Sequence, residues 1–254
     1  MAVVLNDVSY GSFSNISLEI VSGKITGILG DFESGKSVLV DLISNTLTPI
    51  YGNVTVEDSV GVVFQDVEEQ FYFDTLIDNF NFILKMKNCK NIQKRILDSL
   101  RIVGLDTSYL SRTYYSLSLS EVKKASLACA LCTNPRILIL DDIFNGLDKK
   151  DTDMVIRIIF MMKMRYGRTV IVVSRNSDLI HKICDKVIVV SCGNILEYDD
   201  KYNFFMNSNL LKKVGVRMPN IIKCTDLIKA KGVKGIMYRD EVDDLAKDIF
   251  RWIR

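Results

Sequence analysis

Short apolar runs alternate with polar, helix-patterned segments along most of the chain. Alternating apolar and polar positions predict two antiparallel strands over 2–10 and 16–20. Continuous apolar runs predict further strands, of the kind that is buried on both faces of a parallel sheet. These runs occupy 25–29, 60–64, 137–140, 169–173 and 186–190. Because helical segments separate most of them, the pattern predicts an α/β fold with a mainly parallel sheet.

Helical periodicity fills the intervals between these strands. An apolar-periodic helix is predicted over 37–45, and residues 66–135 become mostly helical and more polar. From about residue 205 the pattern changes to short amphipathic helices. The last of them, within 239–254, carries one apolar stripe formed by Val242, Leu245, Ile249 and Trp252 or Ile253. The stripe fits either packing onto its own domain or a contact with another subunit.

Composition narrows the function classes. The chain has 254 residues, of which 48% are hydrophobic and 25% charged, and these values exclude a disordered chain, a collagen and a coiled coil. The net charge of +2 gives no sign of nucleic-acid binding. No apolar run approaches the roughly 18 residues of a transmembrane helix, and the N-terminus does not resemble a secretory signal.

Cysteine and histidine usage argues against a zinc site and a histidine-dependent nucleophile. Cys129 and Cys132 form C-x-x-C within a predicted helix, but the sequence lacks the second such pair that a structural zinc site would need. The six cysteines are therefore expected to be buried thiols in a reducing cytoplasm. His181 is the only histidine, which excludes a histidine-based metal site and a His/Asp triad.

A phosphate-binding loop is the strongest chemical signal. Residues 30–37, Gly-Asp-Phe-Glu-Ser-Gly-Lys-Ser, match G-x-x-x-x-G-K-[ST] between a predicted strand and a predicted helix. Glycines there let successive N–H groups face phosphate oxygens, and the helix N-terminus adds partial positive charge. Lys36 would reach the β- and γ-phosphates and Ser37 would bind Mg²⁺, while Asp31 and Glu33 are expected to face solvent. The predicted ATP-binding residues are Gly30, Ser34, Gly35, Lys36, Ser37 and Val38.

An apolar strand that ends in carboxylates supplies the predicted second half of the nucleotide site. Residues 136–142 read Arg-Ile-Leu-Ile-Leu-Asp-Asp, so Asp141 and Asp142 follow a buried run. Asp141 is predicted to hold Mg²⁺ directly or through a water, and Asp142 stands where a base for the attacking water would lie. The alternative interpretation is a strand that ends in helix-capping aspartates.

In combination these motifs resemble the ATP-binding subunits of ABC transporters over about 1–200. Gln65, in Val-Val-Phe-Gln, resembles the family's Q-loop, and residues 145–148, Asn-Gly-Leu-Asp, resemble its D-loop. Residues 117–121, Leu-Ser-Leu-Ser-Glu, stand in place of the LSGGQ signature, and Arg175 stands at the H-loop. The resemblance implies further roles: Gln65 in Mg²⁺ binding and catalysis, Ser118 and Asp148 in nucleotide contact, and Tyr10 or else Phe13 in stacking on adenine.

The same resemblance implies a domain organisation. It predicts a P-loop NTPase fold of the ABC ATPase type, with an antiparallel β portion near the N-terminus. The ATP-binding domain would span 1–204, with a helical subdomain over about 68–130 that carries the signature. A C-terminal helical extension would span 205–254 and offer a candidate dimer contact.

Two stretches resemble a narrower family, the energy-coupling factor (ECF) transporter ATPases. Residues 64–71 look like that family's Phe-Gln-x-Pro-Glu-x-Gln-Leu stretch, and 211–219 look like the segment that follows its ATPase domain. In that family two ATPase subunits carry a membrane component and a substrate-binding component that import vitamins, other micronutrients or metal ions. The resemblance implies ATP and Mg²⁺ as cofactors. It also implies a second ABC ATPase and an integral membrane component as partners, and a peripheral location on the cytoplasmic face of the cell membrane.

Several residues depart from the family pattern. Asp142 replaces the usual catalytic Glu and is one methylene shorter, and Arg175 replaces a His and cannot shuttle a proton. Arg175 would instead neutralise γ-phosphate charge or form an ion pair with Asp142. Leu119 and Ser120 replace two glycines that the family presses against the partner's ATP. We therefore expect ATP binding, a low hydrolytic rate and a heterodimer rather than a homodimer.

Two other function classes stay open. A non-hydrolysing regulatory or structural nucleotide-binding subunit fits the pair Asp142 and Arg175. A soluble ABC protein acting on nucleic acid or the ribosome usually has two linked ATPase domains or coiled-coil insertions, and the sequence shows neither pattern. The transported solute is not encoded in this chain, because substrate choice in the ECF family lies in other subunits.

Overall fold

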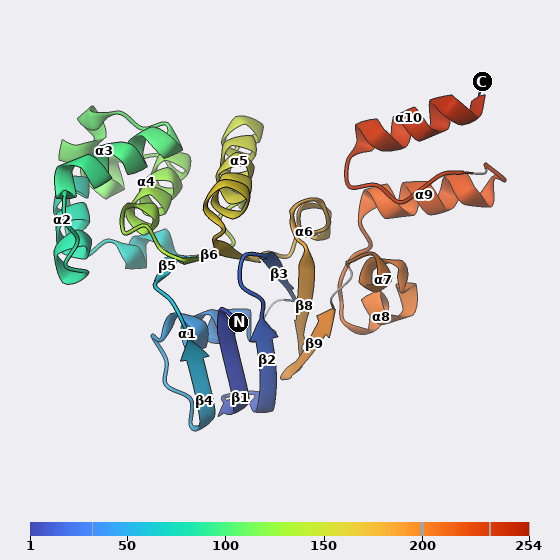
Figure 1. The fold of residues 1–254 in the computed structure, drawn as a ribbon, viewed down its shortest axis with the longest axis horizontal. Coiled ribbons are helices and arrows are strands. Elements are labelled where there is room, and N and C mark those ends of the chain that lie inside the picture. Colours follow the sequence, from blue (N-terminus) through green and yellow to red (C-terminus); the bar gives the residue numbers. More distant parts are fainter. Residues whose placement is uncertain (32, 199–200, 234, 254) are drawn as a thin grey trace.

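The computed structural model describes residues 1–31, 33–198, 201–233 and 235–253, and its strands form a larger and a smaller sheet (Figure 1). The larger sheet has the order β5-β6-β7-β3-β8-β9, and its neighbouring strands are parallel except for β8 and β9. The smaller sheet is antiparallel, with the order β2-β1-β4. The strands are β1 (Val3–Tyr10), β2 (Phe13–Ile20), β3 (Ile25–Leu29), β4 (Tyr51–Val56), β5 (Val60–Val63), β6 (Ile137–Asp141), β7 (Thr169–Val173), β8 (Lys186–Ser191) and β9 (Asn194–Tyr198).

This arrangement confirms the predicted α/β fold with a mainly parallel sheet. The antiparallel pair expected near the N-terminus is β1 with β2, and the five apolar runs are β3, β5, β6, β7 and β8. Every residue of β3, β6 and β7 is buried, as expected of central strands covered on both faces. The edge strands β4 and β9 were not predicted.

Helices cover both faces of the larger sheet and continue into a C-terminal extension. The helix predicted over 37–45 is α1, and the mostly helical interval predicted over 66–135 holds α2, α3, α4 and three short 3-10 turns. The helices and turns are α1 (Lys36–Ser44), η1 (Val67–Gln70), α2 (Leu76–Met86), α3 (Ile92–Val103), η2 (Thr107–Ser111), η3 (Tyr114–Ser116), α4 (Leu119–Cys132), α5 (Lys149–Tyr166), α6 (Ser177–Ile183), α7 (Lys201–Met206), α8 (Ser208–Lys213), α9 (Asn220–Ala230) and α10 (Val242–Ile253).

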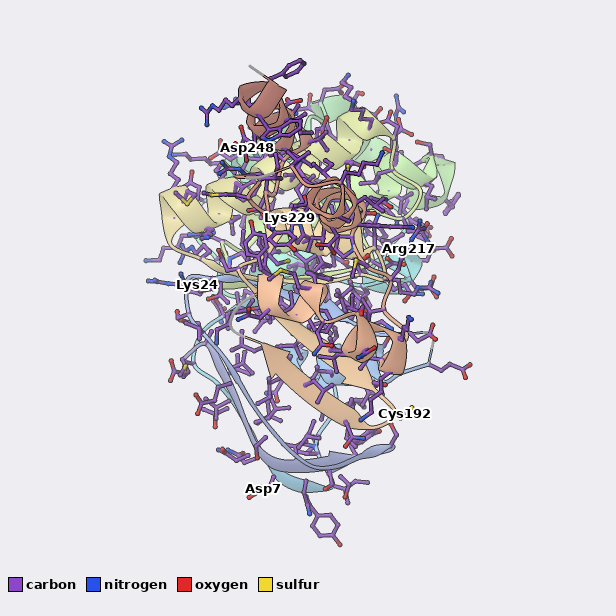
Figure 2. All side chains as sticks on the ribbon, turned by 90° about the vertical axis from the view of Figure 1, so that its right-hand side faces the viewer. Asp7, Lys24, Cys192, Arg217, Lys229 and Asp248 are labelled. Carbon is purple, nitrogen blue, oxygen red and sulfur yellow. The ribbon has the colours of Figure 1, made fainter. Side chains whose placement is uncertain are left out.

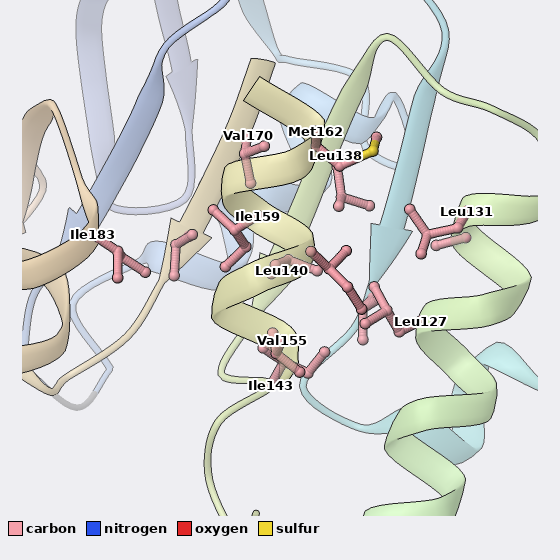
Figure 3. Close-up of a cluster of buried hydrophobic side chains, with 14 of the residues drawn as sticks. Leu127, Leu131, Leu138, Leu140, Ile143, Val155, Ile159, Met162, Val170 and Ile183 are labelled. Carbon is pink, nitrogen blue, oxygen red and sulfur yellow. The ribbon is translucent and has the colours of Figure 1, made fainter. Parts of the chain in front are cut away.

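The core divides into two layers because side chains alternate across the buried strands. On one face of the sheet, Leu138, Leu140 and Val170 pack against helices that include α4 and α5 (Figure 3). On the other face, Ile139 and Ile171 join α1 and the smaller sheet. The two layers fix the carboxyl ends of β3, β6 and β7 at one edge of the sheet, where the phosphate-binding loop emerges.

The C-terminal extension begins inside the main core and ends with a partly exposed helix. Phe204 and Phe205 of α7 are fully buried in the main cluster, so α7 crosses the predicted boundary between 204 and 205. In α10, Leu245 is 3% exposed whereas Val242 and Trp252 are 68% and 51% exposed. The predicted stripe is therefore buried in its middle and exposed at these two positions; the side chain of Ile253 lies outside the described part. Figure 2 places Asp248 of α10 and Asp7 of β1 at opposite ends of the molecule.

The cysteine prediction is confirmed at three positions and wrong at two. Cys129, Cys132 and Cys184 are buried, and burial raises their pKa. Cys192 and Cys224 are exposed. Cys192 follows β8 in the turn to β9 (Figure 2), where the chain reverses direction and leaves little room for burial. Cys89 is half-buried.

A buried histidine joins the main domain to the C-terminal extension. The ring of His181, on α6, is fully buried between the rings of Tyr202 and Phe205 on α7. Its Nε2 lies 3.8 Å from Oδ1 of Asp240, which also pairs with the Lys201 ammonium at 2.8 Å. Burial, together with the positive charge of Lys201, lowers the pKa of His181 to about 4, while Asp240 and Asp178 oppose the shift.

We expect the contribution of His181 to the free energy of unfolding to fall as the pH drops from about 6.5 to 4, the window between its unfolded and folded pKa values. In this pH window the unfolded chain binds a proton on His181 that the folded chain excludes. This difference lowers the contribution of His181 to the free energy of unfolding by about 2 kcal/mol by pH 5. Urea unfolding of the wild type and of His181→Leu at pH 7 and pH 5 measures this contribution as the difference between the two proteins, because groups whose pKa moves the other way, such as Asp141, act on both alike. The variant His181→Leu should lose less over the same interval, and equal losses in both proteins would contradict the assignment.

Candidate functional site

The phosphate-binding loop runs from the end of β3 to the start of α1, as predicted. Gly35 has φ +104°, and a Cβ there would lie 2.9 Å from Cζ of Phe13. A Cβ on Gly30 would lie 2.4 Å from the carbonyl oxygen of Val190. Both positions therefore require glycine, because a side chain would collide with the structure beneath the loop.

The start of α1 is suited to an anion. Within the described part of the loop, no side chain caps the first turn of α1 and no acidic residue lies in that turn. Its N–H groups therefore keep their hydrogen-bonding capacity and the positive end of the helix dipole is not neutralised. Asp31 and Glu33 are both exposed, as predicted, but Glu33 also lines the pocket at this loop.

Lys36 folds back over this loop. Its Nζ donates to the carbonyl oxygens of Gly30 at 3.1 Å and Asp31 at 2.6 Å, and to Oγ of Ser34 at 3.2 Å. Burial and the nearby charge of Arg175 lower the pKa of Lys36, whereas Asp141 and other carboxylates raise it. The ammonium is thus held at the mouth of the loop.

Asp141 is the buried carboxylate at the carboxyl end of β6. It is 4% exposed, and burial together with the neighbouring charge of Asp142 raises its pKa to about 6. Lys36 opposes this shift. A buried carboxylate beside a second carboxylate is stabilised by a bound cation, so the donor set fits Mg²⁺.

A pocket of about 330 Å³ brings most of the predicted site residues together. It joins the phosphate-binding loop to the ends of β6 and β7 and to Gln65, which follows β5. The predicted residues that line it are Ser34, Gly35, Lys36, Ser37, Val38, Gln65, Asp141, Asp142 and Arg175. Glu33, Val173 and Ser174 complete its lining. Its oxygen donors are hydroxyl, amide and carboxylate groups, which suit Mg²⁺.

The described residues contain no cluster of three or more histidine, cysteine and acidic side chains able to hold a metal ion by themselves. Mg²⁺ usually keeps several waters and is bound by one or two carboxylates plus substrate phosphates. The three predicted Mg²⁺ ligands, Ser37, Gln65 and Asp141, all line this pocket, and their oxygens fit a cation that is also bound by phosphates.

Asp142 and Arg175 line the same pocket. Asp142 has a left-handed backbone, with φ +46°, and its N–H donates to the carbonyl oxygen of Val173 at 3.0 Å. A second cavity, of about 360 Å³, also borders both residues and continues toward Asn145 and Gly146. Ser174, which was not predicted as a site residue, is 4% exposed; its only sequence signal is its position directly after β7.

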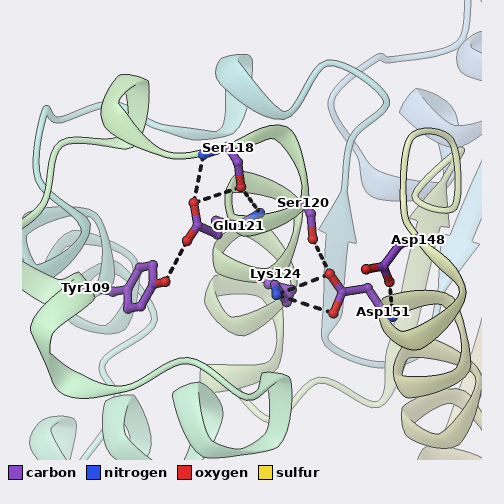
Figure 4. Close-up of polar contacts among 7 residues, drawn as sticks. All are labelled: Tyr109, Ser118, Ser120, Glu121, Lys124, Asp148 and Asp151. Carbon is purple, nitrogen blue, oxygen red and sulfur yellow. Dashed lines mark hydrogen bonds and ion pairs between the residues drawn. The ribbon is translucent and has the colours of Figure 1, made fainter.

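The signature segment lies outside this pocket and is bonded within the chain (Figure 4). Ser118 caps α4: its backbone N–H and its Oγ donate to Oε2 of Glu121 at 2.8 and 2.7 Å. Oε1 of Glu121 accepts from the Tyr109 hydroxyl at 2.6 Å, and these bonds lower the pKa of Glu121 to about 2. The serine hydroxyl that would contact phosphate is already donated to a carboxylate.

The two residues that stand in place of the signature glycines, Leu119 and Ser120, also make contacts within the chain. Ser120 donates a hydrogen bond to Asp151 of α5, which pairs with Lys124 at 3.2 Å. Leu119 is 54% exposed, and its Cδ2 lies 2.6 Å from where a Cβ on Gly146 would stand. Asp148 caps α5 by accepting from the N–H of Asp151 at 2.7 Å. Predicted contacts of Ser118 and Asp148 with nucleotide therefore require another subunit or a rearrangement.

The adenine-stacking residue is not defined by the pocket. Tyr10, the first candidate, is half-buried at the end of β1 and is absent from the pocket lining. Phe13, the second, is 2% exposed and packs against Gly35 as part of the core. Phe13 thus supports the loop from below as a core residue. Stacking by Tyr10 stays a prediction.

Among the described helices, none combines the length and apolar character that a membrane span requires.

Comparisons with known proteins agree on one family. The profile of the ABC transporter family matches residues 13–145, just over half of the chain. The chain is 28% identical to the energy-coupling factor transporter ATP-binding protein EcfA2 of Clostridium perfringens, covering 91% of this chain and 86% of that protein. It is 26% identical to the EcfA2 protein of Mesoplasma florum, covering 97% and 89%.

Solved structures share the fold. CbiO1 from Clostridium perfringens, described as part of the ABC transporter complex CbiONQ, superposes with a TM-score of 0.69 and 25% identity, covering 89% of this chain and 98% of that chain. An ATP-binding cassette solved as a dimer with ADP and phosphate superposes with a TM-score of 0.70 and 22% identity. The match covers 78% of this chain and 98% of the cassette.

Proposed function

The chain belongs to the ABC transporter family, and on that premise we propose that it is the ATP-binding subunit of an ECF-type importer. The observation that carries the proposal is the pocket in which Lys36, Ser37 and Asp141 converge with Gln65. Similarity to ECF ATP-binding proteins along nearly the whole chain supports the same assignment. ATP binding and hydrolysis would be coupled to uptake of a micronutrient or ion.

Each pocket residue has a role that follows from its chemistry. Lys36 and the N–H groups at the start of α1 bind the β- and γ-phosphates, and Gly30 and Gly35 let the backbone approach them. Ser37, Asp141 and Gln65 hold Mg²⁺, which when bound supplies positive charge to the phosphate oxygens. Val38 extends the binding surface along α1, and Tyr10 stacks on adenine.

Hydrolysis at this site is proposed to be slow. Asp142 would accept a proton from water, but its carboxylate stands one methylene further back than a glutamate's, and misplacement by about 1 Å can cost about 100-fold in rate. Arg175 stays protonated, so it neutralises negative charge near the phosphates and cannot relay a proton. Gln65 would link Mg²⁺ occupancy to the membrane component.

The signature geometry supports a heterodimer. Ser118, Ser120 and Glu121 are hydrogen-bonded within the chain, and Glu121 carries a negative charge beside Ser118. Such a surface is a poor partner for the γ-phosphate of another subunit. Two copies of this chain would therefore build two weak sites, whereas a second, intact ATPase would supply a functional signature to this chain's phosphate loop.

The remaining assignments follow the ECF resemblance. Residues 1–204 would form the ATP-binding domain, with the helical subdomain over about 68–130, and residues 205–254 the extension. The exposed Val242 and Trp252 support a dimer contact by α10. The subunit would sit peripherally on the cytoplasmic face of the membrane, held by an integral membrane component, with no nucleic-acid partner.

A second candidate function is a nucleotide-binding subunit that does not hydrolyse ATP. Asp142 and Arg175 favour it, because both replace groups that activate water. Here ATP would act as a ligand that holds a dimer together, and the chain would regulate or support its partner.

Titration of the purified chain with a fluorescent ATP analogue, with and without Mg²⁺, tests the proposal. We expect saturable binding strengthened by Mg²⁺, with turnover far below the roughly 10 s⁻¹ of an ordinary enzyme. Absence of binding would contradict the assignment. Binding with no turnover, even in the complete transporter, would favour the second candidate.

A further inference from the structure

A buried lysine on the signature helix binds the loop that carries Asp142. Lys123, in the first turns of α4, is 6% exposed. Its Nζ donates to the carbonyl oxygens of Asp142 at 3.3 Å and Ile143 at 3.2 Å, and also to the carbonyl oxygen of Asn145. One ammonium group thus holds three carbonyls of the segment that leaves β6.

This loop depends on that ammonium because it has little regular structure of its own. Asp142 has φ +46° and Gly146 has φ +79°, so the chain turns twice through the left-handed region. A non-glycine residue holds such a conformation only where surrounding contacts fix it. Within the loop, two backbone hydrogen bonds are formed: the N–H of Asn145 donates to the carbonyl oxygen of Asp142 at 3.2 Å, and the N–H of Leu147 donates to that of Phe144 at 3.3 Å. Buried carbonyls need donors, and Lys123 provides one to the buried carbonyl of Ile143.

The helix that carries Lys123, α4, is also hydrogen-bonded to the segment that follows Gln65. One turn after Lys123 on α4, Ser126 donates a hydrogen bond to Gln70, whose Nε2 donates at 3.0 Å to the carbonyl oxygen of Ser126. Gln70 ends the turn that follows Gln65. The same helix therefore contacts the segment after Gln65 and the loop that carries Asp142.

We propose that Lys123 is a positioning residue that sets the backbone of Asp142 and ties it to the signature helix. Asp142 is then oriented into the pocket only while α4 keeps its place against the loop. The role of Asp142 itself rests on the proposed function, whereas the contact made by Lys123 does not. Burial lowers the pKa of Lys123 and the charge of Asp142 raises it, in keeping with an ammonium held among carbonyls.

Hydrogen exchange of the nucleotide-free chain tests the contact. Lys123→Met keeps the side-chain length and removes the donors, so exchange across 142–147 should rise about tenfold while the central strands keep their protection. Lys124→Met is the matched control: it lies next on α4 and removes the ion pair with Asp151, so it should spare 142–147. Lys123→Gln retains two N–H donors and should show exchange at 142–147 between that of the wild type and that of Lys123→Met. If Lys123→Met does not fold, Lys123→Gln is compared with the wild type and with Lys124→Met instead.

Unchanged exchange at 142–147 in Lys123→Met would overturn the proposal, as would an equal rise in Lys124→Met. Kinetics of the assembled transporter supply a second readout. In a complex whose partner ATPase is inactivated at its own phosphate-loop lysine, Lys123→Met should lower kcat about tenfold and change the KM for ATP less than about twofold, and unchanged kcat there would also overturn the proposal. If the wild-type complex hydrolyses no ATP, the proposed function fails, and the exchange result still decides whether Lys123 fixes the loop.

Discussion

Replacing Lys36 with alanine is expected to weaken ATP binding at least about 100-fold and to abolish uptake. The ammonium is already held over the loop by Gly30, Asp31 and Ser34, so little ordering is needed when phosphate binds. Its loss removes a positive charge that acts on the buried Asp141, so the negative charge of that carboxylate would be less compensated beside the phosphates. Binding is measured with the fluorescent analogue, and uptake in cells that depend on the transporter.

A matched surface variant separates binding from folding. Lys24, labelled in Figure 2, is exposed, does not line the pocket and precedes the end of β3 opposite the phosphate-binding loop, so Lys24→Ala should bind ATP and support uptake normally. Thermal unfolding of Lys36→Ala should stay close to that of the wild type. Normal uptake by Lys36→Ala would reject the transport role of this site.

Restoring the family's residues is expected to raise ATP turnover by about tenfold or more. Asp142→Glu extends the carboxylate by one methylene toward the attacking water, and Arg175→His introduces a group able to exchange protons near neutral pH. The double variant should gain more than either single change, because the two residues line the same pocket. Turnover is measured in the assembled complex at saturating ATP.

The outcome identifies the limiting group. If Asp142→Glu alone leaves the rate unchanged, Arg175 or the signature limits hydrolysis. An unchanged rate in the double variant would contradict the idea that this pocket is limited by its own residues. Adding Lys36→Ala to the double variant should remove any gain, which confirms that the new turnover comes from this pocket.

The central strands could be predicted because burial leaves a clear mark in sequence. β3, β6 and β7 are buried at every residue, so each is a continuous apolar run. β4 and β9 lie at sheet edges, where one neighbour and one solvated side impose a weaker pattern. In β4 only Val54 and Val56 are partly buried, and its first three residues are exposed.

In the candidate site, the residues that belong to local sequence motifs could be predicted, whereas contacts between elements distant in sequence could not. Lys36, Ser37 and Asp141 belong to motifs whose spacing fixes their place at strand ends, and the structure brings them together. The contacts of Lys123 depend on how α4 lies against the loop after β6, which no spacing encodes. The sequence offered one signal: the positions three and four residues after Lys123 on the same helix, Ser126 and Leu127, are small or apolar, so this lysine lies on a face of α4 that is expected to be buried.

Purification of the tagged chain from its native membranes in mild detergent, with mass spectrometry of what accompanies it, tests the central claim most directly. The account predicts recovery of a second ABC ATPase with an intact signature, together with small integral membrane proteins. Recovery of a homodimer with the same membrane proteins would overturn the heterodimer alone. Recovery of the chain by itself, or with ribosomes or DNA-bound proteins, would contradict an importer subunit.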